Sequence, residues 1–305
     1  MDDLHTKNIQ KLLWYAITQE DEQIRQLIKD SNKKNFDIFK LEKDFRLTII
    51  LHRITKNIPE ITFKGWTCLN KVYFPYFRLS EDLDFSISIE DPLVNTNGKR
   101  ETFAQHIREK MKELTTSLWR KLNDDQYHHK KAQGNEHLKK KEYTYLKYIL
   151  SYQSIYDQSP QSIKIEITYT QKQHFPWIHK HIQSIFIDPI ANDSVFMLQE
   201  IKCLDLQEMI TEKCRACLTR RKPAIRDFFD LRYLQSQWID ILANKEIIKA
   251  KCDEVSDRQR TLENNYDELK KQIETHIIPV INDIGDFDLK RIYDQMITLQ
   301  KELFE

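Results

Sequence analysis

Residues 63–89, FKGWTCLNKVYFPYFRLSEDLDFSISI, constrain the fold of this chain more than any other segment. The segment opens with a glycine turn at Gly65 and ends in an alternating pattern that contains Asp82 and Asp84. Side chains two residues apart on a β-strand point to the same face, so we expect the two carboxylates to project together, with Leu83 on the other face. Adjacent carboxylates repel each other and are costly to bury unpaired, so we expect a cation between them.

The chemistry of this pair favours Mg²⁺ as the cation. Oxygen ligands suit Mg²⁺, and an ion held by one or two carboxylates usually binds water and substrate phosphates at its remaining positions. The backbone amides of the glycine turn, and of the short helix expected after it, are suited to face an anion. The segment therefore predicts an enzyme of phosphoryl or nucleotidyl transfer.

Length and composition limit the class of protein and its partners. A chain of 305 residues can form one large domain or two modest ones. Its 48 basic and 47 acidic residues give a net charge of +1, so a nucleic-acid-binding surface must be local. The 4 glycines indicate few tight hairpins and much helix. The 5 cysteines are odd in number and widely spaced, which argues against a disulfide framework, and packing explains Cys214 and Cys217 better than a redox or zinc site.

The amino terminus, MDDLHTKNIQ, lacks a signal-peptide pattern, and no apolar run approaches the length of a membrane span. We therefore expect a cytoplasmic protein that does not contact a membrane.

Periodicity predicts the order of helices and strands. Helical spacing of apolar residues predicts helices over 4–30, 41–54, 101–122 and 288–304, and a helix that begins near Asp205. We interpret the strongly charged residues 250–273 as one leg of a helical hairpin. Alternation and β-branched residues predict strands over 61–63, 143–152, 162–170 and 184–187.

Residues 127–141 are rich in lysine and histidine and lack apolar periodicity. We interpret them as an exposed loop. An arm that contacts RNA phosphates is the alternative, and a metal site at His128, His129 and His137 is a weaker one.

Glu166 lies in the alternating segment Ile-Lys-Ile-Glu-Ile and shares one face with Lys164. By itself this pattern fits a solvated sheet face as well as a functional carboxylate.

Taken together, these blocks resemble the AbiEii toxins, a branch of the polymerase-β-type nucleotidyltransferases. The glycine turn and the carboxylate strand match the family pattern at Lys64, Gly65, Thr67, Leu69, Lys71, Arg78, Ser80, Asp82 and Asp84. Trp66 departs from it, because the family has a second glycine there, and an indole is expected to narrow or reshape the phosphate cradle.

The resemblance implies roles for residues far apart in the sequence. Glu166 matches the third metal-binding carboxylate, so Asp82, Asp84 and Glu166 are the expected Mg²⁺ ligands. Lys213 matches a functional lysine that binds triphosphate or offsets developing charge. Asp227 matches an essential late aspartate that accepts the hydroxyl proton or orients a basic partner such as Arg226, whereas Asp230 is expected to cap or brace. The expected nucleotide- and phosphate-binding residues are Lys64, Gly65, Thr67, Lys71, Arg78, Ser80 and Arg226.

The resemblance also implies an α+β fold: a mixed β-sheet flanked by helices in a nucleotidyltransferase core over 1–200, and a helical domain over 201–305 that carries Lys213 and Asp227. The expected activity is Mg²⁺-dependent transfer of a nucleoside monophosphate from NTP to an acceptor hydroxyl, with the tRNA 3′ end as the first acceptor to consider. The expected role is that of the toxin in a toxin–antitoxin or phage-defence pair, with a cognate antitoxin as partner. Two alternatives remain open: a small-molecule or protein acceptor, and a binding module without activity.

Overall fold

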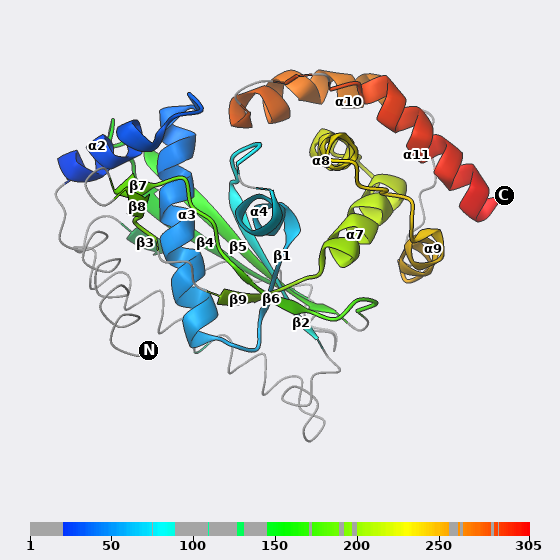
Figure 1. Ribbon diagram of the computed structural model, residues 1–305, viewed down its shortest axis with the longest axis horizontal. Coiled ribbons are helices and arrows are strands. Elements are labelled where there is room, and N and C mark those ends of the chain that lie inside the picture. Colours follow the sequence, from blue (N-terminus) through cyan, green and yellow to red (C-terminus); the bar gives the residue numbers. More distant parts are fainter. Residues whose placement is uncertain are drawn as a thin grey trace. The chain divides into compact units, whose positions relative to one another are not determined.

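The computed structural model describes residues 21–74, 76–88, 109, 127–130, 145–170, 173–188, 192–196, 200–255, 262, 265–281, 284–285 and 287–305. The chain divides into two compact units, which we call unit 1 (Met1–Leu204) and unit 2 (Asp205–Glu305) (Figure 1). The helix predicted over 101–122, apart from Glu109, the first part of the helix predicted over 4–30, and residues 131–141 lie outside the described residues. No helix in the described ranges is long and apolar enough to span a membrane.

The helices of unit 1 follow the predicted order. The helix predicted over 41–54 is confirmed as the longer α3, which begins after Asp37, whose side chain accepts a hydrogen bond from Lys40 N at 2.9 Å. Figure 1 shows α3, in blue, running alongside the sheet. The helical elements of unit 1 are α2 (Asp21–Ser31), α3 (Ile38–Asn57), α4 (Gly65–Cys68) and the π-helical turn η1 (Leu69–Tyr73).

The predicted mixed sheet is confirmed. Within the described residues it has 7 strands in the order β3-β4-β5-β2-β1-β9-β6, and a separate pair is formed by β7 and β8. Strand β2 lies between β1, which is antiparallel to it, and β5, which is parallel to it. The strands are β1 (Thr62–Lys64), β2 (Asp82–Ser88), β3 (Tyr127–Lys130), β4 (Tyr145–Gln153), β5 (Pro160–Thr170), β6 (Ile178–His181), β7 (Ile187–Asp188), β8 (Asp193–Ser194) and β9 (Glu200–Cys203).

Alternation along the two central strands separates an apolar face from a polar one. The apolar residues of β2 and β5 are fully buried on one face, and this burial of branched side chains is the main favourable contribution to packing here. The acidic and basic residues of both strands therefore share the other face. The buried apolar residues are Leu83, Phe85, Ile87, Ile163, Ile165 and Ile167.

Several strand predictions were wrong. Tyr127–Lys130, predicted as part of a loop, is strand β3 and pairs with β4. β6 and β9 were not predicted, because each has only four residues, too few for the alternation of Glu200–Cys203 to stand out. β9 nevertheless lies inside the sheet, parallel to β1 at Phe63 and Cys203. The edge strand predicted over 184–187 is reduced to Ile187–Asp188.

Unit 2 consists of helices in its described residues. The helix predicted near Asp205 is confirmed, since the Asp205 side chain caps α7 by accepting from Gln207 N at 2.7 Å. The single leg predicted over 250–273 is wrong, because α9 ends at Asp253 and α10 begins only at Tyr266. The elements are α7 (Leu206–Thr219), α8 (Ile225–Ser236), α9 (Lys245–Asp253), α10 (Tyr266–Gln272), η3 (Ile273–Ile277), η4 (Ile278–Val280) and α11 (Leu289–Phe304).

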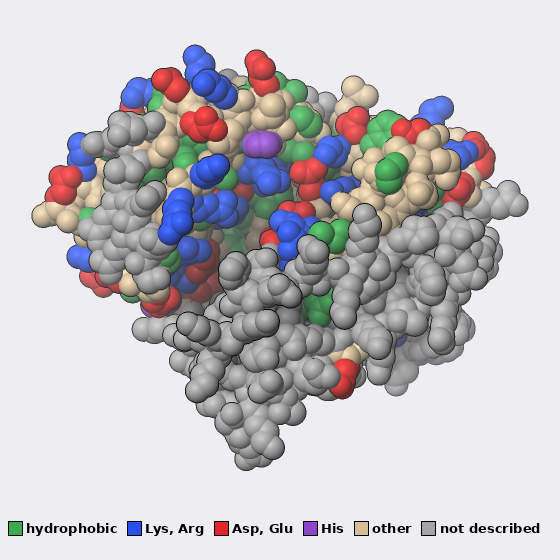
Figure 2. All heavy atoms as spheres, turned by 180° about the vertical axis from the view of Figure 1, so that it is seen from behind, with side chains coloured by type: hydrophobic (Ala, Val, Ile, Leu, Met, Phe, Trp, Pro, Cys, Tyr) green, Lys and Arg blue, Asp and Glu red, His purple; other side chains and the backbone are tan. Residues whose placement is uncertain are grey.

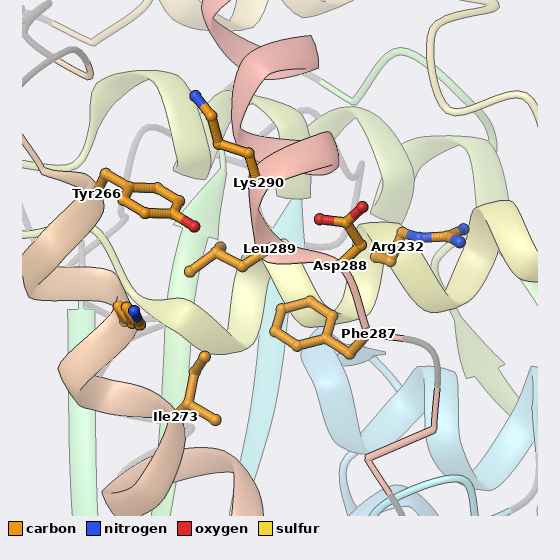
Figure 3. A pocket seen from close by; sticks show the side chains of 8 residues that line it. Arg232, Tyr266, Ile273, Phe287, Asp288, Leu289 and Lys290 are labelled. Carbon is orange, nitrogen blue, oxygen red and sulfur yellow. The ribbon is translucent and has the colours of Figure 1, made fainter.

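A pocket of about 580 Å³ lies within unit 2, between α8, α10 and the start of α11 (Figure 3). Its apolar side chains include Phe287 and Leu289, and Lys290 lies at its edge, where its ammonium pairs with Asp294 at 2.6 Å. The pocket contains none of the residues predicted for catalysis or phosphate binding. Figure 2 shows Lys and Arg side chains interspersed with Asp and Glu, as the near-neutral composition leads one to expect.

Candidate active site

Strand register brings together carboxylates that are about eighty residues apart in the sequence. In the parallel pair of β2 and β5, Asp84 is the direct neighbour of Glu166, and Asp82 is the direct neighbour of Lys164. Directly paired residues of adjacent strands project to the same face. Asp82, Asp84 and Glu166 therefore lie on the polar face of the sheet, opposite the buried apolar residues.

Lys164 joins two of these carboxylates. Its ammonium lies 3.0 Å from Asp82 Oδ2 and 3.1 Å from Glu166 Oε2. Partial burial lowers the pKa of Lys164, but the hydrogen bonds and negative charges of Asp82 and Glu166 outweigh this effect, and the pKa lies above its ordinary value. The lysine is thus held in its charged form as the counter-ion of the pair.

Asp84 is the carboxyl group that the environment disturbs most. Burial, with the negative charges of Glu166 and Asp82 as smaller contributions, raises its pKa to about 6, and the positive charge of Lys64 opposes this rise. A carboxyl group with such a pKa lacks sufficient positive charge nearby when it is ionised. An added cation would therefore stabilise the ionised form of Asp84.

Gly65 is packed directly against this carboxyl group. Its φ is +71°, in the left-handed region that favours glycine, and a Cβ built on it would lie 2.5 Å from Asp84 Oδ2. The preceding residue, Lys64, is the antiparallel neighbour of Asp84 on β1, and its ammonium donates to Thr168 Oγ1 at 2.7 Å. The glycine turn and Lys64 thus meet the carboxylate strand at Asp84.

Other residues of the sequence motif are buried near the glycine turn and the start of β2. Thr67 Oγ1 donates to the backbone oxygen of Asp82, which ties α4 to the start of β2. Trp66 is only 7% exposed. Its ring lies 3.4 Å from the guanidinium carbon of Arg78 and 4.3 Å from the ring of Phe77. The indole at the family's second glycine position is therefore packed in the interior.

Lys71, which the resemblance predicts as a phosphate-binding residue, is 0% exposed. Its ammonium donates to Asp44 Oδ2 at 2.9 Å, Thr48 Oγ1 at 2.8 Å and Tyr76 OH at 3.1 Å. Burial lowers its pKa, and the charge of Asp44 counteracts this. These contacts give Lys71 a structural role between η1 and α3, while its predicted contact with phosphate stays a prediction.

Arg78 and Ser80 are likewise buried. Arg78 Nη1 donates to the backbone oxygen of Leu79 at 3.4 Å, and Ser80 Oγ has no hydrogen-bond partner in the described part of the chain. The structure places both residues in the segment that leads to β2, and their predicted contact with phosphate is untested.

The carboxylates of Asp82, Asp84 and Glu166 are chemically suited to bind a magnesium ion. They supply only oxygen atoms from neighbouring strands, as Mg²⁺ requires, and the raised pKa of Asp84 indicates a need for positive charge. They do not form a ready cluster: among the described residues, no three His, Cys, Asp or Glu side chains are gathered closely enough to hold a metal ion. Lys164 is bonded to Asp82 and Glu166 instead.

Sequence reasoning missed two lysines that lie at this site. The shared face of Lys164 and Glu166 was evident from the alternation, but the ion pair with Asp82 depends on strand register. Lys43 of α3 gave no sequence signal. Burial lowers its pKa, and the negative charges of Glu81 and Asp82 oppose this, so its ammonium interacts with one of the three carboxylates, Asp82.

In unit 2, the structure brings together the predicted functional residues of α7 and α8. Lys213 Nζ lies 2.7 Å from Asp227 Oδ1 and 2.9 Å from Asp230 Oδ2, and Arg220 Nη1 lies 2.9 Å from Asp227 Oδ2. Asp230 is fully buried, whereas the Lys213 side chain is 15% exposed. Asp227 therefore orients two basic partners, Lys213 and Arg220, and its predicted pairing with Arg226 stays a prediction.

Arg226 is half-buried in the first turn of α8. The nearby Arg220, Arg221 and Lys222 are exposed and form the local basic cluster that the near-neutral net charge conceals.

A mixed sheet with three acidic side chains on adjacent strands, and a glycine turn packed against one of them, is the arrangement expected of a nucleotidyltransferase. Residues 50–299 match the family model described as nucleotidyl transferase AbiEii toxin, type IV TA (toxin–antitoxin) system. Because the match covers most of the chain, the protein belongs to the AbiEii nucleotidyltransferase toxin family.

Two solved structures show similarity to this chain. One is that of JHP933 from Helicobacter pylori, with 16% sequence identity and a TM-score of 0.44, covering 88% of this chain and 93% of that one. The other is a candidate nucleotidyltransferase from H. pylori, with 16% identity and a TM-score of 0.43, covering 86% of this chain and 95% of that one. No curated protein matches the sequence.

Proposed function

We propose that this protein is a Mg²⁺-dependent nucleotidyltransferase that moves a nucleoside monophosphate from NTP to an acceptor hydroxyl. The observation that carries the proposal is the register of β2 and β5, which makes Asp84 the neighbour of Glu166 on the face reached by Gly65. The family match over residues 50–299 supports nucleotidyl transfer as the reaction class.

Each group on this face has a proposed task. Asp82, Asp84 and Glu166 hold Mg²⁺, which when bound activates the acceptor hydroxyl and stabilises the leaving pyrophosphate. Lys64 and the backbone of Gly65 bind the nucleotide phosphates beside Asp84.

Four further residues of the motif keep the turn and the strand in position for this chemistry. We propose a supporting role for them, because their side chains are buried and some of them bond elsewhere. They are Thr67, Lys71, Arg78 and Ser80.

In unit 2, we assign Lys213 to the triphosphate or to the charge that develops on it during transfer. Asp227 positions Lys213 through their contact of 2.7 Å, and Asp230 braces the same ammonium from the interior. Arg226 remains a proposed phosphate contact. The two aspartates fix the position of the Lys213 ammonium, which a phosphate-binding cation requires.

The acceptor that we propose is the 3′ end of tRNA, and the biological role is that of a toxin neutralised by a cognate antitoxin, with phage defence as its setting. Family membership supports the toxin and its antitoxin partner. The alternative of an inactive binding module loses its main argument, because the side chain of Trp66 is packed on Arg78 in the interior.

The test is transfer of label from each of four α-³²P-labelled NTPs to separate pools of RNA, protein and metabolites, with Mg²⁺ or with EDTA. We expect label in the tRNA fraction, and a loss of at least about 100-fold in Glu166→Gln, as for removal of a key catalytic group. Glu200→Gln is the matched control, because Glu200 is an exposed glutamate on β9 of the same sheet. Equal labelling by the Glu166→Gln protein would refute the proposed active site, and label in protein or metabolites alone would refute the tRNA acceptor.

A further inference from the structure

Lys164 is the side chain at the proposed active site whose contacts the nucleotidyl transfer reaction does not explain. It bonds Asp82 Oδ2 at 3.0 Å and Glu166 Oε2 at 3.1 Å, and these atoms belong to carboxylates on two different strands. It lies on the same strand as Glu166, two residues away, and is the register neighbour of Asp82. Its position is therefore fixed by the sheet and by two ion pairs at once.

These ion pairs do not have the features of a strong structural contact. The Lys164 side chain is 33% exposed, and its two partners are 27% and 23% exposed. Solvent-accessible ion pairs contribute little to stability. The Lys71–Asp44 ion pair of the same unit is different, because both of its side chains are 0% exposed. That pair has the burial expected of a lysine with a structural role.

We infer that Lys164 is a built-in counter-ion that occupies the place of the divalent cation between Asp82 and Glu166, and that a metal ion must displace it. The Lys164 ammonium and the metal ion compete for the same carboxylate oxygens, so binding of one at these oxygens excludes the other. The inference rests on the proposed function, because it concerns the same metal-binding carboxylates. It also accounts for the absence of a ready metal-binding cluster among the described residues.

A second consequence concerns the metal-free protein. Without a cation, Asp82, Asp84 and Glu166 repel one another on neighbouring strands. Lys164 offsets part of this repulsion in the metal-free protein. Lys164 is thus a positioning residue, since it acts through the carboxylates.

The experiment measures binding of Mn²⁺, a spectroscopic stand-in for Mg²⁺, by electron paramagnetic resonance and calorimetry in the absence of nucleotide. We expect affinity to rise in the order Lys164→Arg, wild type, Lys164→Met. Arginine binds carboxylates in a bidentate manner and competes more strongly, whereas methionine removes the competitor. A single charge a few ångströms from a divalent ion changes its affinity by about tenfold even in a water-like dielectric, so Lys164→Met should bind Mn²⁺ about tenfold more tightly.

Lys147→Met is the matched control. Lys147 is an exposed lysine on β4 and the register neighbour of Glu166 on its other side. Its removal lowers the positive charge near Glu166 by the same amount but removes no ion pair that bridges Asp82 and Glu166. We expect it to change Mn²⁺ affinity by less than about threefold, since exposed charges are screened.

Thermal unfolding gives a second readout. Lys164→Met should have a lower Tm than Lys147→Met in EDTA, and saturating Mn²⁺ should raise its Tm more than it raises that of the wild type. If Lys164→Met does not fold, the comparison of Lys164→Arg with wild type still tests the order of affinities.

The outcomes separate this inference from the proposed function. If wild type binds Mn²⁺, Asp82→Asn abolishes binding, and Lys164→Met binds no more tightly than Lys147→Met, the counter-ion role is wrong while the metal site stands. If wild type and Lys164→Met both fail to bind Mn²⁺ at millimolar concentration, the proposed metal-dependent function and the inference fail together.

Discussion

Gly65 and Asp84 are packed so closely that a Cβ on Gly65 would lie 2.5 Å from Asp84 Oδ2. Because real Cβ atoms do not approach oxygen so closely, any side chain at residue 65 must displace the carboxylate or open the turn. The contact joins the glycine turn, which opens the sequence motif, to the carboxylate strand, which ends it. It explains why a chain with only 4 glycines has one at this position.

We therefore predict that Gly65→Ala abolishes nucleotidyl transfer and destabilises the protein by about 1–3 kcal/mol, through the unfavourable backbone conformation and the clash with Asp84. Label transfer and chemical denaturation measure the two effects. Gly285→Ala is the control, because Gly285 also has a positive φ, of +51°, and a Cβ there meets nothing within 4 Å. Gly285→Ala should lower the free energy of unfolding by about 1 kcal/mol and leave nucleotidyl transfer unchanged. Wild-type activity in Gly65→Ala would contradict the proposed role of the turn.

The raised pKa of Asp84 predicts a dependence of stability on pH. The folded protein holds this proton up to a pKa of about 6, whereas the unfolded chain releases it near the ordinary value of 3.8. The contribution of Asp84 to stability is therefore present below about pH 4 and is lost as pH rises towards 6. In EDTA at pH 7.5, Asp84→Asn should be more stable than wild type by up to about 3 kcal/mol, and the difference should vanish near pH 4.

Urea denaturation across this pH range measures the difference. Asp240→Asn, at an exposed aspartate that accepts a hydrogen bond from Leu242 N, is the control and should not show the same gain. A metal-free Asp84→Asn protein less stable than wild type at pH 7.5 would show that the ionised Asp84 is well compensated, contrary to the argument.

The buried ammonium of Lys71 leads to a prediction that separates structure from phosphate binding. Lys71→Met leaves the fully buried Asp44 without its cation and should destabilise the protein by about 3–5 kcal/mol. The double variant Asp44→Asn/Lys71→Met should recover most of this stability and should transfer label at close to the wild-type rate. If the double variant is stable but its KM for NTP rises at least tenfold, Lys71 binds phosphate after all.

Sequence alone predicted the elements of this fold that have strong local patterns. The alternation around Leu83 and Ile165 predicted two strands with one polar face, and family resemblance added Glu166 as the partner of Asp82 and Asp84. Register can be obtained only from the folded sheet, so the contact between Lys164 and Asp82 was not predicted.

Other features depend on partners that are distant in the sequence. Strand β9 has four residues and is stabilised by pairing with β1 and β6, which its own pattern does not reveal. The role of Lys71 depends on α3, which brings Asp44 and Thr48 to its ammonium. Motif matching predicted Lys71 as a phosphate contact, and it could not show that the ammonium is buried against α3.

The contacts of Lys213 predict different effects for the two aspartates that hold it. Asp227 is joined to Lys213 at 2.7 Å and to Arg220 at 2.9 Å, whereas Asp230 is fully buried and joined to Lys213 at 2.9 Å. Asp227→Asn should lower transfer by about 100-fold or more, since it removes an orienting charge beside a group proposed to act on the substrate. It should also destabilise the protein by about 1–3 kcal/mol, because this carboxylate is buried and loses charged contacts with Lys213 and Arg220. Asp230→Asn should mainly destabilise the protein, by about 1–3 kcal/mol, because it weakens a buried charged hydrogen bond.

Single-turnover label transfer and urea denaturation of both variants measure these effects. Arg220→Gln is the control for Asp227, because Arg220 is half exposed and its loss leaves Lys213 paired with both aspartates. It should lower transfer less than Asp227→Asn does. If Asp230→Asn lost transfer as completely as Asp227→Asn while keeping full stability, the two aspartates would act as one functional unit. The separate bracing role of Asp230 would then be wrong.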